Sequence, residues 1–325
     1  MRVFINGFGR IGRSVLRAWA QGAGAGIEIV GINDIAAPDM CAYLFEYDSV
    51  FGPWPGTVAL EPGALVVDGR AIPLHRTPDI SGLDLRGVDL VMECTGRADT
   101  AEVAGRGLRA GAARVLISGP SKAADLTVVL GANEAALAGQ RIVSNASCTT
   151  NALAPLARLI HAGWGIVTGS MTTIHCYTGS QPTVDAPAAD FSRSRAAALS
   201  MVPTTTSAQR LLDLVLPDLA GRLEGSAVRV PTASVSAVDL CVMTERPATA
   251  EAVNAAFRAA GGVIGATDRP LVSTDLRARP ESVVMACPET RVTRGGMLRV
   301  FGWYDNEWGF SNRMLDVARV MGAKG

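Results

Sequence analysis

Residues 3–12 of this 325-residue chain read VFINGFGRIG. A short apolar run predicts a strand over residues 3–5, and a helical pattern follows over residues 13–20. Between them stands GxGxxG, whose first glycine permits a tight turn, whose second lets the backbone approach a pyrophosphate, and whose third lets helix pack on strand. Because this pattern lies between a strand and a helix, it predicts a dinucleotide site, with the candidate residues Phe8, Gly9, Arg10, Ile11 and Gly12.

A second predicted strand, residues 27–32, runs into Asn33 and Asp34, and Asp34 lies 22 residues after Gly12. A carboxylate at that spacing accepts hydrogen bonds from an adenosine ribose and repels a 2′-phosphate, so we expect NAD rather than NADP as the cofactor. The alternative is a glycine turn that binds nothing, and the correctly spaced acid makes it the weaker hypothesis.

The same alternation continues along the first half of the chain. Further strands are predicted over residues 89–92, 114–117, 128–130 and 142–143, and a helix is predicted over residues 100–110. Strands alternating with helices indicate an α/β fold with a doubly wound (Rossmann) parallel sheet. Ligands bind at the carboxyl ends of such strands, so Thr95, Gly96 and Ser118 are expected along the cofactor groove. Residues 52–74, rich in Gly and Pro, are expected to form an antiparallel excursion.

Composition narrows the classes of partner. Thirty Lys and Arg balance thirty Asp and Glu, so nothing indicates an electrostatic nucleic-acid or membrane partner. Six cysteines without a CxxC spacing and only three histidines give no framework for a metal site. No apolar run approaches the roughly eighteen residues of a membrane span, and no signal-peptide pattern is visible, so a cytoplasmic protein with reduced cysteines is expected.

Residues 144–151 read SNASCTTN and stand between a strand-like run, residues 141–143, and a helix-like run, residues 152–161. Ser147 is a natural N-cap, and the unpaired N–H groups and positive dipole at a helix N-terminus would favour a Cys148 thiolate. The thiolate is the nucleophilic form of cysteine. A buried cysteine without chemistry is the alternative, and for this residue alone the two hypotheses are about equally supported.

The second half of the chain has longer strand patterns. Strands are predicted over residues 166–177, 227–231, 236–244 and 296–303, with helices over residues 208–216 and 250–260. These elements indicate an α+β domain with a mainly antiparallel sheet, beginning at about Cys148.

A cysteine nucleophile needs a base, and the three histidines are His75, His161 and His175. The first two are better explained as cap or surface residues, which leaves His175, although spacing alone does not show that it meets Cys148. Arg229 interrupts a strand before Pro231, where a partly buried guanidinium would need an anion.

Other polar residues in this half have two explanations. Threonines 204–206 precede the helix over residues 208–216, so they are caps that could also bind an anion. Arg193 and Arg195 are expected in a solvated loop or a subunit contact.

The chain resembles phosphorylating glyceraldehyde-3-phosphate dehydrogenase and its close relative, erythrose-4-phosphate dehydrogenase. The motifs that carry the resemblance are INGFGRIGR at residues 5–13, SNASCTTN at 144–151, TTIH at 172–175, RVPT at 229–232 and WYDNE at 303–307. The resemblance implies that a Cys148 thiolate attacks an aldehyde, that His175 lowers the thiol pKa and acts as the base, and that inorganic phosphate releases the resulting thioester as an acyl phosphate.

The resemblance also implies binding residues. The substrate phosphate maps to Thr178 and Arg229, inorganic phosphate to Ser147, Thr149, Thr206 and Ser207, the nicotinamide to Asn306, and the rest of the cofactor groove to Arg76, Thr95 and Ser118. Ser207 replaces a glycine of the family, Ser180 an aspartate, Ser192 an arginine and Phe310 a tyrosine. A homotetramer acting in glycolysis is implied, with a cofactor domain of residues 1–147 joined by the C-terminal helix 309–325, and a catalytic domain of residues 148–308.

Two alternatives remain at this point. A relative could oxidise erythrose 4-phosphate or another sugar-phosphate aldehyde, with release of the acid by hydrolysis. A non-catalytic homologue could use Cys148 only as an oxidisable thiol.

Overall fold

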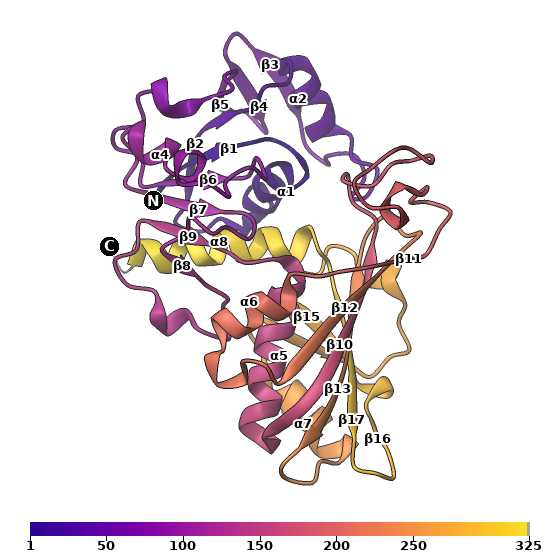
Figure 1. Cartoon of the computed structure of the whole chain (residues 1–325). Helices are drawn as coiled ribbons and strands as arrows, with labels where there is room; N and C mark the ends of the chain where they lie inside the picture. The colour runs from indigo at the N-terminus through magenta and orange to yellow at the C-terminus, as the bar shows by residue number, and fades with distance from the viewer. Residues whose placement is uncertain (324–325) are drawn as a thin grey trace. The chain divides into compact units, whose positions relative to one another are not determined.

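The computed structural model describes residues 1–323, which fold as two compact units (Figure 1). Among these residues, the first unit comprises Met1–Val128, Glu134–Ala146 and residues 311–323, and the second comprises Val129–Asn133 and Ser147–Phe310. No helix within residues 1–323 combines the length and the apolar character that crossing a membrane requires.

The first unit is built on a nine-stranded sheet in the order β3-β4-β5-β2-β1-β6-β7-β9-β8. Its strands are β1 (Arg2–Asn6), β2 (Glu28–Asn33), β3 (Val58–Glu61), β4 (Ala64–Val67), β5 (Arg70–His75), β6 (Leu90–Glu93), β7 (Arg114–Ile117), β8 (Leu126–Thr127) and β9 (Ile142–Ser144). From β5 to β8 every neighbouring pair is parallel, which confirms the predicted doubly wound sheet.

The predicted antiparallel excursion is also confirmed, since β3, β4 and β5 form an antiparallel meander. The turn between β4 and β5 consists of Asp68 and Gly69, whose φ angles are 50° and 75°. Two successive positive φ angles are what a two-residue hairpin turn requires, and Asp-Gly supplies them at little steric cost.

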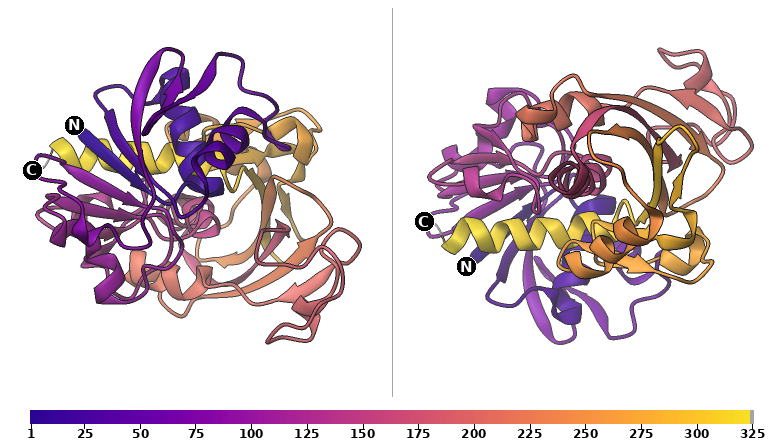
Figure 2. Two further views of the ribbon diagram at one scale, coloured as in Figure 1. Left: turned by 90° about the horizontal axis from the view of Figure 1, so that it is seen from above. Right: turned by 90° about the horizontal axis from the view of Figure 1, so that it is seen from below.

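The helices of the first unit are α1 (Arg10–Ala18), α2 (Pro38–Glu46), α3 (Ala101–Ala104), α4 (Arg106–Arg109) and most of α8 (Trp308–Ala323). Figure 2 shows α8 in yellow. It is tied to the first unit because Arg319 donates to the Ala23 carbonyl at 2.6 Å and Arg114 donates to the Met321 carbonyl.

One strand predicted in the first half of the chain is wrong. Residues 128–130 were expected to be a strand, but β8 ends at Thr127. The Val129 N–H bonds instead to the Asn133 side chain at 2.8 Å, and the Val129 carbonyl accepts from Ala132 in a turn. Val128 and Val129 are fully buried, so their apolar character reflects the core rather than a strand.

The second unit contains an eight-stranded sheet, in the order β11-β12-β10-β13-β17-β15-β14 with β16 beside β17. Its strands are β10 (Ile166–Cys176), β11 (Val202–Thr204), β12 (Leu223–Val230), β13 (Ser236–Thr244), β14 (Ile264–Thr267), β15 (Val283–Ala286), β16 (Arg291–Val292) and β17 (Leu298–Tyr304). Only β10–β12 and β14–β15 pair in parallel, so the sheet is mainly antiparallel, as predicted.

The helices of this unit are α5 (Cys148–Trp164), α6 (Ala208–Val215) and α7 (Ala250–Ala260), and α5 packs against the sheet. Alternation along β10 places Thr173 and His175 on the buried face, because successive side chains of a strand point to opposite sides. In the parallel pair β10–β12, His175 lies opposite Arg229. The sheet therefore brings a base and a cation to neighbouring positions.

Candidate active site

The N-terminus of α5 carries Cys148 as its first helical residue. Ala146 precedes the helix with a φ of 54°, an uncommon value for a residue other than glycine. Ser147 then caps the helix, because its hydroxyl accepts the Thr150 N–H at 3.1 Å. The predicted N-cap is confirmed, and the helix begins four residues earlier than the apolar pattern indicated, since small polar residues fill its first turn.

Cys148 and His175 meet, although 27 residues separate them. The Sγ of Cys148 lies 3.6 Å from Nε2 of His175. His175 is 7% exposed, and its ring meets the edge of Tyr304 with the ring centres 6.1 Å apart. The Tyr304 hydroxyl is within hydrogen-bond distance of the Thr149 and Thr173 hydroxyls, at 2.8 and 2.7 Å. Tyr304 therefore contacts the His175 ring and links Thr149, which follows Cys148 in the chain, to Thr173 on the strand that carries His175.

The far nitrogen of His175 has two neighbours. Nδ1 lies 2.7 Å from the Cys176 carbonyl oxygen and 2.6 Å from Nη1 of Arg229. The same Nη1 donates to the Cys176 carbonyl at 2.9 Å. Arg229 is thus a direct neighbour of the base.

Burial acts against the charged form of both Cys148 and His175. Burial raises the pKa of the Cys148 thiol, while hydrogen bonds involving Thr149, the charge of Arg229 and the N-terminal N–H groups oppose that rise. Burial and then the charge of Arg229 lower the pKa of His175 to about 4. The helix N-terminus therefore acts in the direction expected from the sequence, while removal of the charged form from water acts against it.

A cavity of about 390 Å³ opens above this pair in the second unit. Its walls include Ser147, Cys148, Thr149, Thr173, His175, Arg193, Thr205, Thr206, Ser207, Ala227 and Arg229. The structure thus brings together most residues assigned to the two phosphates. Thr178 is not among the residues lining the cavity, and its hydroxyl pairs with that of Ser180 at 3.0 Å.

Arg193 is exposed in a loop, as expected, but it also lines the cavity, which the sequence did not predict. Its Nε donates to the Thr204 hydroxyl at 2.7 Å and its Nη2 to that of Thr205 at 3.3 Å, which hold the guanidinium at the cavity wall. Arg195, grouped with it in the sequence, instead pairs with Asp185 at the surface. Both arginines lie in a loop segment without hydrophobic periodicity, so the local sequence gave no signal that Arg193 would line the cavity and Arg195 would not.

A second recess, of about 240 Å³, lies in the first unit at the carboxyl ends of β1, β2 and β6. Its walls include Asn6, Gly7, Gly9, Asn33, Asp34, Ile35, Thr77, Pro78, Cys94, Thr95, Arg97 and Arg106. Strands β1 and β6 are neighbours, while β2, which follows β1 in the chain, lies on the other side of β1. The recess therefore occupies the topological switch point, the usual ligand position in such folds.

The three glycines fit a dinucleotide. A Cβ on Gly7, whose φ is 95°, would come within 2.7 Å of the Cys94 and Thr95 backbone, and one on Gly12 would come within 2.0 Å of the Gly7 carbonyl. A Cβ on Gly9 would meet nothing within 4 Å, so this position is open to a ligand. The Asp34 carboxylate is fixed by the N–H groups of Phe8 at 2.6 Å and Ala36 at 2.9 Å.

Other predicted cofactor residues have structural partners. The Arg10 guanidinium pairs with Asp48, and Arg76 Nε donates to the Ile35 carbonyl at 3.1 Å. Phe8 is buried and stacks on Phe45. Phe8, Arg10, Ile11, Gly12, Arg76, Gly96 and Ser118 are not among the residues lining the recess. In the second unit, the Asn306 side-chain oxygen accepts from the Cys176 thiol at 3.1 Å.

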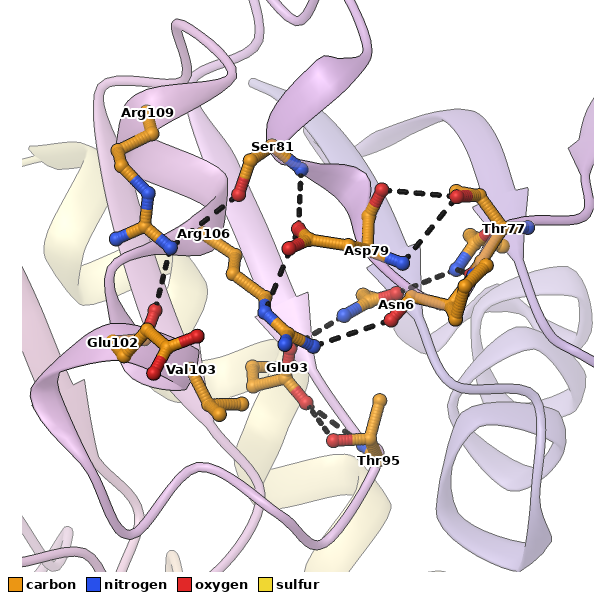
Figure 3. Close-up of polar contacts among 12 residues, drawn as sticks. Asn6, Thr77, Asp79, Ser81, Glu93, Thr95, Glu102, Val103, Arg106 and Arg109 are labelled. Carbon is orange, nitrogen blue, oxygen red and sulfur yellow. Dashed lines mark hydrogen bonds and ion pairs between the residues drawn. The ribbon is translucent and has the colours of Figure 1, made fainter.

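Figure 3 shows polar contacts at the edge of this recess that sequence reasoning missed. Glu93, only 2% exposed, accepts from the Asn6 side chain at 2.5 Å and from the Thr95 N–H at 3.0 Å. Arg106 lies 3.5 Å from Asp79 and donates to the Pro78 carbonyl. A carboxylate at the end of the buried run Leu90–Glu93 is a signal that could have identified Glu93.

Comparisons with known proteins identify the family of the chain. Residues 1–101 match the family model described as "Glyceraldehyde 3-phosphate dehydrogenase, NAD binding domain", and residues 147–306 match the C-terminal domain of the same family. The chain is 49% identical to glyceraldehyde-3-phosphate dehydrogenase of Cereibacter sphaeroides, over 99% of this chain and 98% of that one. It is 44% identical to that of Geobacillus stearothermophilus and 42% identical to glyceraldehyde-3-phosphate dehydrogenase 1 of Bacillus subtilis, in both cases over 100% of this chain and 99% of the relative. The chain belongs to the glyceraldehyde-3-phosphate dehydrogenase family.

Proposed function

We propose that this protein oxidises glyceraldehyde 3-phosphate to 1,3-bisphosphoglycerate with NAD, through a thioester on Cys148. The observation that carries the proposal is the 3.6 Å approach of Cys148 Sγ and His175 Nε2 at a cavity with two arginines in its walls. A thiol beside a base forms and releases covalent intermediates, and the arginines favour substrates that carry phosphate. The relatives named above support the choice of aldehyde.

Cys148 begins the reaction. Its Sγ adds to the aldehyde carbon while its proton passes to Nε2 of His175, which returns a proton to the new alkoxide and gives a thiohemiacetal. His175 then takes the hydroxyl proton as the C–H bond breaks, which leaves a thioester on Cys148. NAD, when bound, is the acceptor of the hydride that leaves this carbon.

Inorganic phosphate completes the cycle. It attacks the thioester carbonyl, the C–S bond breaks, and the acyl phosphate leaves with Cys148 as thiolate, which His175 reprotonates. We assign Ser147, Thr149, Thr206 and Ser207 to this phosphate, and add Arg193 because it lies at the same cavity wall. Arg229 and Thr178 are assigned to the substrate phosphate.

The cofactor is assigned to the first unit. Gly7, Gly9 and Gly12 would accommodate the pyrophosphate at the start of α1, and Asp34 would accept the ribose hydroxyls, a preference for NAD over NADP. Asn306 is proposed for the nicotinamide amide. We also propose residues 1–147 with helix 309–325 as the cofactor domain, and residues 148–308 as the catalytic domain.

The family resemblance supports a homotetramer. The role in glycolysis supports a cytoplasmic location. This assembly is part of the proposal, and its direct check is the mass of the purified protein in solution.

The test is formation of NADH from glyceraldehyde 3-phosphate and from erythrose 4-phosphate, each with and without inorganic phosphate. We expect the triose phosphate to give the higher kcat/KM and its steady-state turnover to depend on phosphate. Preference for erythrose 4-phosphate would replace the substrate assignment, and equal turnover without phosphate would indicate hydrolysis of the thioester. A protein that binds NAD without turnover of either aldehyde would support the redox-sensing alternative.

A further inference from the structure

Cys176 is the last residue of β10, and its thiol takes no part in the reaction steps described above. The side chain is fully buried, and its S–H group donates a hydrogen bond to the side-chain oxygen of Asn306 at 3.1 Å. Burial raises the pKa of this thiol to about 12, so the S–H group is present throughout the neutral pH range. Cys176 is therefore a constant hydrogen-bond donor to the residue assigned to the nicotinamide.

Ser236, the first residue of β13, is a second donor to the same oxygen. Its hydroxyl oxygen accepts the Cys176 N–H at 3.1 Å, and its proton is donated to the Asn306 side-chain oxygen at 3.4 Å. The Ser236 hydroxyl also contacts the Cys176 sulfur, which is a weaker acceptor than an amide oxygen. Ser236 is only 1% exposed, so water does not replace these partners.

The two donors determine which way the Asn306 carboxamide faces. A carboxamide has an oxygen that only accepts hydrogen bonds and an NH₂ group that only donates them. If the Asn306 carboxamide were turned round, its NH₂ group would face the Cys176 and Ser236 donors. Both buried protons would then lose their best acceptor, which is unfavourable. Oδ1 is therefore held toward the protein interior.

The other end of the carboxamide is left available. Nδ2 of Asn306 has no hydrogen-bond partner within residues 1–323, and it is not sealed from solvent. The backbone around it is fixed, because the Asp305 carboxylate accepts the N–H groups of Glu307 at 3.0 Å and Trp308 at 2.8 Å. Asn306 therefore presents a donor, and not an acceptor, to a ligand.

We propose that Cys176, together with Ser236, is a positioning residue for the cofactor, because it holds the Asn306 carboxamide so that Nδ2 donates to the carbonyl oxygen of the nicotinamide amide. The inference rests on the proposed function insofar as Asn306 binds that amide. A fixed donor at this position recognises the carbonyl group of the cofactor and not its NH₂ group, and it restricts the rotation of the nicotinamide ring.

Infrared spectroscopy of the S–H stretch tests the hydrogen bond itself, in the protein without cofactor or substrate. The chain has six cysteines, and the Cys176 band is the one that is missing from the spectrum of Cys176→Ala. Because a hydrogen bond lowers the stretching frequency of its donor, this band should move to higher wavenumber in Asn306→Ala. A band that stays in place would overturn the proposal.

The positioning role is tested by calorimetric titration with NAD and with its 3-acetylpyridine analogue, in which a methyl group replaces the NH₂ and the carbonyl oxygen remains. Cys176→Ala frees the Asn306 carboxamide to turn, so its oxygen can accept from the NH₂ of NAD but finds no donor on the analogue. The ratio of the analogue's Kd to that of NAD should therefore rise at least threefold. It should return toward the wild-type value in Cys176→Ser, which restores a donor.

The matched control is Cys241→Ala, which removes a thiol from β13 of the same sheet and should leave the ratio unchanged. An unchanged ratio in a folded Cys176→Ala variant would overturn the proposal. If that variant does not fold, Cys176→Ser identifies the infrared band, and Ser236→Ala, which removes the second donor, takes its place in the titration. Because neither measurement needs turnover, a protein that shows both effects and oxidises neither aldehyde would refute the proposed reaction alone.

Discussion

Replacement of Arg193 by glutamine tests how the cavity recognises phosphate. The guanidinium is held at the cavity wall by the Thr204 and Thr205 hydroxyls, at 2.7 and 3.3 Å, so it is oriented before any ligand arrives. A hydrogen bond to a charged group contributes about 1.5–3 kcal/mol, and the lower end applies because the Arg193 side chain is exposed to water. Since about 1.4 kcal/mol corresponds to a tenfold change, Arg193→Gln should lower kcat/KM for inorganic phosphate about tenfold.

The assay is steady-state NADH formation with inorganic phosphate varied at saturating aldehyde, and then with aldehyde varied at saturating phosphate. The matched control is Arg195→Gln, which removes a charge two residues away that pairs with Asp185 outside the cavity. This control should leave both constants within about twofold, as expected of an exposed ion pair. If Arg193→Gln raises the KM for the aldehyde and leaves the phosphate dependence unchanged, Arg193 belongs to the substrate phosphate and our assignment is wrong.

Three further predictions follow from the local geometry. First, the pKa of His175 is lowered from 6.5 in the unfolded chain to about 4 in the folded protein. Between these pH values the folded protein binds fewer protons than the unfolded chain. The free energy of unfolding should therefore fall by up to about 3 kcal/mol as the pH is lowered from 6.5 to 4. Urea unfolding of the wild type and His175→Asn at pH 7 and pH 4.5 should show a steeper loss for the wild type, and equal losses would contradict the lowered pKa. Second, Asp34→Asn should narrow the preference of kcat/KM for NAD over NADP at least tenfold, since it removes the charge that repels a 2′-phosphate; an unchanged ratio would exclude Asp34 as the determinant. Third, Ser147→Ala should lower the free energy of unfolding by about 1 kcal/mol because α5 loses its N-cap. The control is Ser170→Ala, at an exposed strand position. If Ser147→Ala lowers the Tm no more than this control does, the cap does not stabilise the protein.

Local patterns in the sequence were enough for most of the architecture. The glycine pattern after β1, the alternation of strands and helices, and the Gly- and Pro-rich residues 52–74 are local features of the sequence, and they led to the correct sheet types. The strand predicted over residues 128–130 was wrong because Val128 and Val129 are apolar for a different reason: they are buried at the start of a turn.

The site was predictable as a set of residues but not as an electrostatic environment. Residue types singled out Cys148 and His175 as the candidate pair, whereas their approach to 3.6 Å could not be read from spacing and is given by the structure. The thiol pKa was not predictable, since it depends on how far packing removes Cys148 and His175 from water. The position of Arg193 depends on how a long loop returns to β11, and the Arg229–His175 contact depends on strand register; neither is encoded in a short window.

Capture of the covalent intermediate tests the central claim most directly. The protein is mixed with glyceraldehyde 3-phosphate and NAD without inorganic phosphate, quenched in acid, and analysed by mass spectrometry of the intact chain and its peptides. The account predicts one phosphoglyceryl group per chain on the peptide that contains Cys148, its loss when phosphate is added before the quench, and no adduct in Cys148→Ser. An active enzyme that forms no adduct, or one with the adduct on another residue, would contradict it.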